Sequence, residues 1–266
     1  MYNVTIEFMT NLKQSKKQAV KAQILGVGVS GTSFEEVLEI ISAQCSVLRN
    51  KKPYFVITAY SEFFLEAQKN PAFRQALDKA DLIVPDGVSA VAAIDHVQKP
   101  SFWYGLYVGW KILSGQYYGK TVVGVDLVRK ILDDKTKKVF LLGGWGGVAG
   151  KVAKKYNCDF VDGDPSPEFF AKLSKSKPDI LLVSLGGIKQ EIWIANNIHK
   201  LECKVVIGVG SSFDELAKIP GWDSPAPLWV NKMGLKWLWR AIHNPRHWPR
   251  ALRAAIVFPW KVWRES

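Results

Sequence analysis

The feature that most restricts the fold is a regular alternation of short apolar segments with amphipathic segments of helical periodicity. The runs within 54–58, 179–185 and 204–209 are rich in Val, Ile and Leu. Strands that are apolar along their whole length are typical of a parallel sheet buried on both faces, and their alternation with helices is typical of an α/β protein. The sequence therefore predicts a Rossmann-like, mostly parallel sheet with helices on both faces.

The expected elements follow from these patterns and from capping residues. Ser33 and Glu36 form the pattern of a capping box, Ser61 is expected to cap a helix, and proline opens two others. Strands are expected at 4–8, 24–29, 54–58, 82–84, 138–142, 159–161, 179–185 and 204–209. Helices are expected from Phe34, Glu62 and Pro71 and at 88–94, 124–132, 148–156, 167–174 and 189–200.

The chain has 266 residues, close to the upper size for one hydrophobic core. We expect an N-terminal extension (1–22), an α/β core (23–219) and a C-terminal helical appendage (220–266) that begins with a proline-rich linker. Within the core, 101–118 is an aromatic insertion, too short for a membrane span. Two interpretations of the insertion remain open: a helix packed on the core, or a lid or membrane-dipping loop.

The net charge of +12 is concentrated in the appendage. Between 228 and 264 there are eight Lys and Arg residues, no Asp or Glu, and six of the eleven tryptophans. This composition is typical of an interfacial membrane element, although a nucleic-acid surface is also basic and aromatic. We expect one helix over 228–242, with its basic residues and its tryptophans on different faces, and a second basic segment over 249–258.

Cysteine usage predicts the compartment. Cys45, Cys158 and Cys203 are scattered, and the absence of a Cys-x-x-Cys pair argues against a zinc ribbon and a disulfide framework. The sequence begins without the pattern of a signal peptide. We therefore expect a protein of the reducing cytoplasm.

Asp86 is the candidate general base. The apolar strand 82–84 runs into Pro85-Asp86-Gly87, where proline should end the strand. In open α/β sheets, ligands bind outside the carboxyl ends of the strands, and a carboxylate placed there can accept a proton. The alternative is that Asp86 merely caps the following helix.

The glycine-rich turns after other strands are candidate ligand loops. Gly144-x-Gly146-x-x-Ala149 resembles a dinucleotide fingerprint, which we interpret as a nucleotide-diphosphate loop. An NAD-dependent oxidoreductase is therefore one alternative, and the charge keeps a non-enzymatic nucleic-acid-binding protein as another. Asp162-x-Asp164 resembles a metal-binding pair, but aspartates beside Gly and Pro are more often turn residues, and we assign no metal there.

The turns at 186–191 and 208–214 follow strands in the same way. The first either starts a helix, with Glu191 favourable to its dipole, or places Lys189 or Gln190 on a phosphate or sugar. The four histidines lack metal-ligand spacing, and we interpret them as structural.

Taken together, these motifs resemble the WecG/TagA/CpsF glycosyltransferase family, in consistent order over roughly 23–253. The motifs are Thr58, Pro85-Asp86-Gly87, Gly124-Val125-Asp126-Leu127, Leu142-Gly143-Gly144, Gly187-Ile188-Lys189-Gln190-Glu191, Gly208-Val209-Gly210-Ser211-Ser212-Phe213-Asp214, Ala226-Pro227-Leu228-Trp229, Gly234-Leu235-Lys236-Trp237-Leu238, Arg240, Asn244-Pro245-Arg246 and Arg250.

The resemblance implies an inverting transfer of N-acetylmannosamine or a related hexose from a UDP-sugar to a polyprenyl-diphosphate-linked sugar, in bacterial cell-surface polysaccharide synthesis. It implies Asp86 as the base and Thr58 as a second catalytic residue. We expect an enzyme that needs no metal or other cofactor and no nucleic acid. The basic, tryptophan-rich appendage predicts a peripheral position on the inner face of the cell membrane, at an anionic surface. A homo-oligomer is also considered. The expected substrate-binding residues are Gly143, Gly144, Asp126, Lys189, Gln190, Asp214, Arg240 and Arg246.

The chain departs from the family pattern at a few positions. Thr58-Ala59-Tyr60 stands where the family often has Thr-Pro-Asn, so we expect a polar contact to be lost. Ile188 replaces a proline, Thr121 an arginine and Lys236 a glutamate. These changes bear on the donor sugar more than on the fold or the reaction type.

Overall fold

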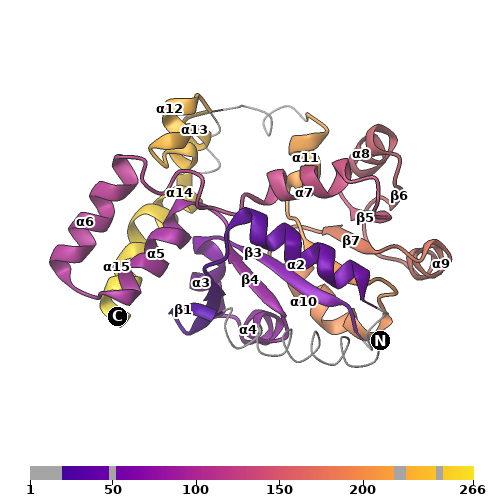
Figure 1. The fold of residues 1–266 in the computed structure, drawn as a ribbon, viewed down its shortest axis with the longest axis horizontal. Helices are drawn as coiled ribbons and strands as arrows, with labels where there is room; N and C mark the ends of the chain where they lie inside the picture. The colour runs from indigo at the N-terminus through magenta and orange to yellow at the C-terminus, as the bar shows by residue number, and fades with distance from the viewer. Residues whose placement is uncertain (1–19, 48–51, 219–225, 244–247) are drawn as a thin grey trace, which may run out of the picture.

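The computed structural model describes residues 20–47, 52–218, 226–243 and 248–266. Its centre is a six-stranded sheet in the order β4-β3-β8-β7-β5-β6, in which every pairing is parallel (Figure 1). The predicted fold class is therefore confirmed. The strands of this sheet are β3 (Tyr54–Ala59), β4 (Leu82–Pro85), β5 (Val139–Gly143), β6 (Asp159–Val161), β7 (Ile180–Ser184) and β8 (Val205–Gly208).

Helices cover both faces of the sheet because successive strand residues point to opposite sides. Phe55 and Ile57 enter one apolar cluster, whereas Val56 enters the other. The first cluster includes residues of α3 (Ser61–Ala67), α4 (Pro71–Asp78), α5 (Val88–Gln98), α9 (Pro167–Ser176), α10 (Lys189–Asn197) and α15 (Phe258–Glu265). The second includes residues of α2 (Phe34–Ser46), α7 (Gly124–Asp133), α8 (Val148–Tyr156) and α11 (Ser212–Leu216).

The first described strands form a hairpin outside the main sheet. β1 (Val20–Ile24) pairs antiparallel with β2 (Val27–Ser30) around Leu25 and Gly26, which have φ angles of 47° and 76°. The single strand predicted at 24–29 is therefore wrong, because the chain reverses in its middle. The strand expected at 4–8 lies outside the described residues.

Two predictions of helix starts had different outcomes. The capping box of α2 is confirmed: the Ser33 backbone N–H donates to Glu36 Oε2 at 2.7 Å, and the Glu36 N–H donates to Ser33 Oγ. The prediction that Ser61 caps a helix is wrong, because Ser61 is the first residue of α3 and Tyr60 is its N-cap.

The C-terminal segment forms shorter helices than predicted. The single helix expected over 228–242 is wrong: it is divided into α12 (Leu228–Lys232) and α13 (Lys236–His243). Gly234 lies between them with φ 68°, and a Cβ atom there would lie 3.1 Å from Val88 Cγ1. Close packing of this turn on α5 therefore requires glycine.

After α14 (Trp248–Leu252) the chain continues through a π-helical turn (Arg253–Val257) into α15. The Phe258 ring stacks on Phe64 of α3 with centroids 5.6 Å apart. Phe258 and Val262 belong to the first apolar cluster, so α15 is packed into the core. Pro220 and Pro225 of the expected linker lie outside the described residues.

The aromatic insertion contains the helix α6 (Phe102–Leu113). Val108 is the buried residue of this helix, whereas most of its large apolar side chains are exposed. The interpretation of the insertion as a helix packed on the core therefore fits only its inner side. Among the described residues, no helix has both the length and the apolar character needed to cross a bilayer.

Candidate active site

Three side-chain oxygens from different strand ends converge on the first turn of α7. A Cβ atom at Gly124 would lie 3.2 Å from Asp86 Oδ2, 3.4 Å from Thr58 Oγ1 and 3.9 Å from Ser212 Oγ. Thr58 is the second-last residue of β3, Asp86 follows β4, and Ser212 begins α11 after β8. These strands are neighbours in the sheet, so the sequence-predicted pair Asp86 and Thr58 lies at one point of its carboxyl edge.

Backbone hydrogen bonds hold this cluster in place. The Asp86 N–H donates to Ala59 O at 2.9 Å, which ties the end of β4 to the end of β3. The Val122 N–H donates to Pro85 O at 3.0 Å, which brings the start of α7 beside the same point. The position of Asp86 is therefore set by the ends of two strands and by the segment before α7.

The structure does not use Asp86 as the cap of the helix that follows it. The N-cap of α5 is Gly87, and Asp86 Oδ2 instead accepts from the Gly124 N–H at 3.4 Å, at the start of α7. The interpretation of Asp86 as the cap of α5 is therefore wrong. Asp86 Oδ2 therefore faces the first turn of α7, beside the Thr58 and Ser212 hydroxyl groups.

Tyr60 connects this site to the C-terminal segment. Arg250 Nη2 donates to Tyr60 Oη at 3.2 Å, and the guanidinium carbon lies 5.4 Å from the centre of the tyrosine ring. Burial raises the Tyr60 pKa to about 12, Arg250 opposes the shift, and Asp86 is one of the nearby carboxylates that add to it. The sequence predicted a lost polar contact at Tyr60, but its phenol accepts a hydrogen bond from an arginine of the tail.

Gln190 and Glu191 brace the loops after β7 and β8. Gln190 Oε1 accepts from the Gly210 N–H at 3.1 Å, and its Nε2 donates to Glu191 Oε1 at 2.6 Å. Glu191 Oε2 accepts from the Ile188 N–H at 2.7 Å, and complete burial raises the Glu191 pKa to about 7. Gln190 is 2% exposed, and its hydrogen bonds hold the loops after β7 and β8 together. Its predicted contact with a substrate stays a prediction.

The first two glycines of the loop after β5, Gly143 and Gly144, pack against the protein's own atoms, whereas a Cβ atom at Gly146 would meet nothing within 4 Å. The Gly144 N–H donates to Ser184 O, and a Cβ atom at Gly143 would lie 2.2 Å from the same oxygen. Asp162 Oδ1 accepts from the Ala149 N–H at 2.9 Å, at the start of α8. A carboxylate at this helix N-terminus repels a diphosphate, which weakens the case for a dinucleotide here.

Asp162 therefore has a structural role. Within the described parts of the chain, no three His, Cys, Asp or Glu side chains gather into a group that could hold a metal ion. The expected independence from metal stays a prediction, as does nucleotide binding by Gly143 and Gly144.

Three other predicted binding residues, Asp126, Lys189 and Asp214, each lie in the first turn of a helix. Asp126, in the first turn of α7, pairs with Arg129 at 2.7 Å, and Lys189 is the exposed first residue of α10. Asp214 lies in the first turn of α11, where burial raises its pKa. Arg240 belongs to α13, and Arg246 lies outside the described residues.

Sequence reasoning did not select Ser212 or Arg250 as site residues. Both are among the residues that carry the family resemblance, but neither has a spacing to other polar residues that marks it as functional. Ser212 belongs to the site because β8 lies next to β3, and Arg250 because the tail folds back onto α3. The order of the strands could have indicated Ser212, whereas Arg250 depends on how the tail folds onto α3.

The geometry defines the class of protein: an α/β enzyme with a candidate base at the carboxyl edge of a parallel sheet and a basic tail folded onto the core. A model of the Glycosyl transferase WecG/TagA/CpsF family matches residues 22–102 and 104–266. The chain belongs to this family.

Curated relatives support this placement. A Bacillus spizizenii protein named N-acetylglucosaminyldiphosphoundecaprenol N-acetyl-beta-D-mannosaminyltransferase is 30% identical over 234 residues, which cover 83% of this chain and 81% of that protein. Proteins of the same name from two strains of Staphylococcus aureus are each 27% identical over 264 residues, which cover 94% of both chains. The predicted family and enzyme class are therefore confirmed, and the oxidoreductase and nucleic-acid alternatives lose their support.

Proposed function

We propose that this glycosyltransferase moves N-acetylmannosamine, or a related hexose, from a UDP-sugar to polyprenyl-diphosphate-linked N-acetylglucosamine. The observation that carries the proposal is the convergence of Asp86, Thr58 and Ser212 at Gly124, in a chain whose relatives are named for that acceptor. The departures from the family pattern near the site leave the donor sugar to experiment.

Asp86 is the base in the proposed reaction. Its carboxylate takes the proton from the acceptor hydroxyl, the hydroxyl oxygen forms a bond to the anomeric carbon, and the bond from that carbon to the UDP oxygen breaks. Attack from the face opposite to UDP inverts the anomeric configuration. Thr58 and Ser212, whose hydroxyl oxygens lie beside the same point, are placed to orient the reacting hydroxyl.

Arginines of the tail meet the charge that develops on the leaving diphosphate. Arg250 is held over Tyr60, and Arg253 Nη1 pairs with Glu62 Oε1 at 2.8 Å, so both guanidinium groups have defined positions beside α3. Guanidinium groups bind phosphate oxygens through paired hydrogen bonds. In this proposal UDP departs without a tightly bound metal, and Arg240 and Arg246 stay predicted contributors.

The tail also attaches the enzyme to the inner face of the cell membrane. Trp229, Trp260 and Trp263 are 49–60% exposed, and Arg264 stacks on the Trp260 ring at 5.2 Å. Tryptophan favours the headgroup level, and each basic side chain near an anionic surface contributes about 1 kcal/mol. A homo-oligomer stays a prediction.

A substrate panel tests the proposed function. Purified enzyme is incubated with several UDP-sugars and a polyprenyl-diphosphate-linked N-acetylglucosamine, and the product is analysed by mass spectrometry and NMR. We expect transfer of one sugar, with inversion at its anomeric carbon, in the presence of a chelator. Retention of configuration, or transfer only to acceptors without the diphosphate, contradicts the proposal.

A further inference from the structure

Helix α6 presents a row of large apolar side chains to solvent. Spaced three or four residues apart, they form one continuous stripe along the helix. Contiguous exposed apolar surface of this kind marks an interaction site. The row consists of Phe102, Trp103, Leu106, Tyr107, Trp110 and Leu113, which are 46–77% exposed.

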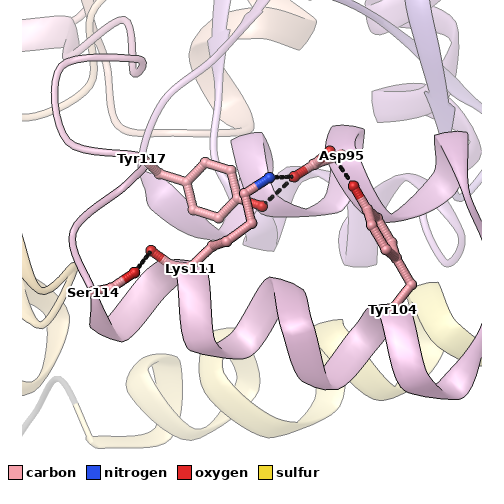
Figure 2. Close-up of polar contacts among 5 residues, drawn as sticks. All are labelled: Asp95, Tyr104, Lys111, Ser114 and Tyr117. Atoms are coloured by element: carbon pink, nitrogen blue, oxygen red, sulfur yellow. Dashed lines mark hydrogen bonds and ion pairs between the residues drawn. The ribbon is translucent and has the colours of Figure 1, made fainter.

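The opposite side of α6 fixes the direction in which this row points. Asp95 of α5 accepts hydrogen bonds from Tyr104 Oη at 3.0 Å, from Lys111 Nζ at 2.5 Å and from Tyr117 Oη at 2.5 Å (Figure 2). Val108 packs between these contacts, in a small apolar cluster with α5. The helix therefore cannot rotate to bury its outer row without breaking the hydrogen bonds to Asp95.

These hydrogen bonds also keep the Asp95 carboxyl ionised. Burial would raise its pKa, but the bonds from Lys111, Tyr117 and Tyr104 outweigh burial and hold the pKa below its ordinary value. The anchor of α6 is therefore a charged carboxylate at neutral pH, with the apolar row on the far side of the helix.

The charge around α6 favours an anionic partner. Between Asp95 and Asp126 the chain has three lysines and no Asp or Glu. Lys111 pairs with Asp95, whereas Lys99 and Lys120 are exposed on either side of α6 in the sequence. Helices α6 and α15 both pack on α5 (Figure 1), and α15 carries the exposed Trp260 and Trp263. Two separate segments that are both aromatic and basic thus pack on one helix, and the one acidic residue of α15, Glu265, accepts hydrogen bonds from Gln68.

The length and the side chains of α6 fit a bilayer interface. A helix of 12 residues is about 18 Å long, too short to span a bilayer but long enough to lie in its surface. Tryptophan and tyrosine are the side chains that favour the headgroup level.

We propose that α6 is a membrane-docking element in its own right, separate from the basic tail. It lies in the plane of an anionic bilayer with its aromatic row at headgroup depth, and Asp95 holds it in that orientation. This inference rests on the proposed function only in that a polyprenyl-linked acceptor brings the enzyme to a membrane.

Vesicle sedimentation with the full chain tests the proposal. The vesicles contain equal parts of phosphatidylcholine and phosphatidylglycerol, and the double variant Trp103→Ser/Trp110→Ser is compared with the unchanged protein. We expect at least about tenfold weaker binding, equivalent to about 1.4 kcal/mol. The matched control is Trp145→Ser, which removes an indole as exposed as that of Trp110 (56% for both) but on the loop after β5, and it should bind vesicles normally.

A second variant and a second assay separate docking from folding and from catalysis. Leu106→Asp places a charge on the apolar row and should also weaken vesicle binding, with an unchanged melting temperature. Both α6 variants should transfer sugar normally to a short-chain, water-soluble acceptor diphosphate. If the unchanged protein transfers sugar to none of these acceptors, the proposed function is contradicted, whereas docking by α6 is not.

Two results overturn the proposal. One is vesicle binding by the folded α6 variants that equals that of the unchanged protein. The other is a dimer in analytical ultracentrifugation that Trp103→Ser/Trp110→Ser dissociates, because the row would then be covered by a second copy of the chain.

Discussion

The N-termini of α7 and α8 lie at the same edge of the sheet, but their backbone N–H groups have different acceptors. At α8, the glycine-rich start is closed by the chain's own Asp162, whose oxygen lies 2.9 Å from the Ala149 nitrogen. At α7, Asp86 makes a longer contact of 3.4 Å with Gly124, and two hydroxyl groups lie beside it. The more obvious glycine motif thus marks a closed helix start, whereas the candidate base lies at the less obvious one.

The comparison predicts its largest effect at Asp86. Asp86→Asn keeps the size of the side chain but removes the basic oxygen, so turnover should fall by a factor on the order of 10²–10⁴ if Asp86 is the general base. The measurement is the rate of sugar transfer under saturating donor and acceptor, with the melting temperature as a check of folding. A folded Asp86→Asn protein with near-normal turnover would falsify the assignment.

The start of α7 can be altered without mutating any of the three polar side chains. A methyl group at Gly124 would lie 3.2 Å from Asp86 Oδ2 and 3.4 Å from Thr58 Oγ1, so these oxygens must move by a few tenths of an ångström. Since a misplacement of about 1 Å can cost 10²-fold, Gly124→Ala should lower turnover by roughly tenfold. Alanine also favours helix more than glycine, so the melting temperature should stay the same or rise.

Gly143→Ala is the matched control for that change. Gly143 has a φ of 100°, and its added methyl group would lie 2.2 Å from the Ser184 carbonyl oxygen. This variant should lose stability first, with a lower melting temperature, whereas Gly124→Ala should lose turnover at full stability. If both variants changed turnover and melting temperature in the same way, Gly124 could not be distinguished from a glycine that only allows close packing.

Local patterns in the sequence predicted most of the fold. The alternation of buried strands and helices is a short-range property, and the parallel sheet follows from it, as does the Ser33–Glu36 capping box. The predictions failed where a few residues decide the backbone. Leu25 and Gly26 reverse the chain inside an apolar run, and Gly234 divides a helix because it packs against Val88.

The candidate site was only partly accessible to such reasoning. The position of Asp86 at a strand end predicted its location, because strand ends of a parallel sheet meet at one edge. The contribution of Ser212 depends on β8 lying next to β3, and the contact between Tyr60 and Arg250 joins residues 190 positions apart. Sequence patterns of short range contain no information about either neighbour.

The smallest predicted effect concerns the closed helix start at α8. Asp162→Ala removes the oxygen that accepts from the Ala149 N–H, and loss of such a contact at a helix N-terminus costs about 1 kcal/mol of stability. We expect a slightly lower midpoint in urea unfolding, with turnover and the Kd for UDP unchanged, because the reacting groups gather at α7. Should Asp162→Ala bind UDP clearly more tightly, the carboxylate was repelling a diphosphate from α8, and the loop at Gly143 and Gly144 would regain its predicted role in nucleotide binding.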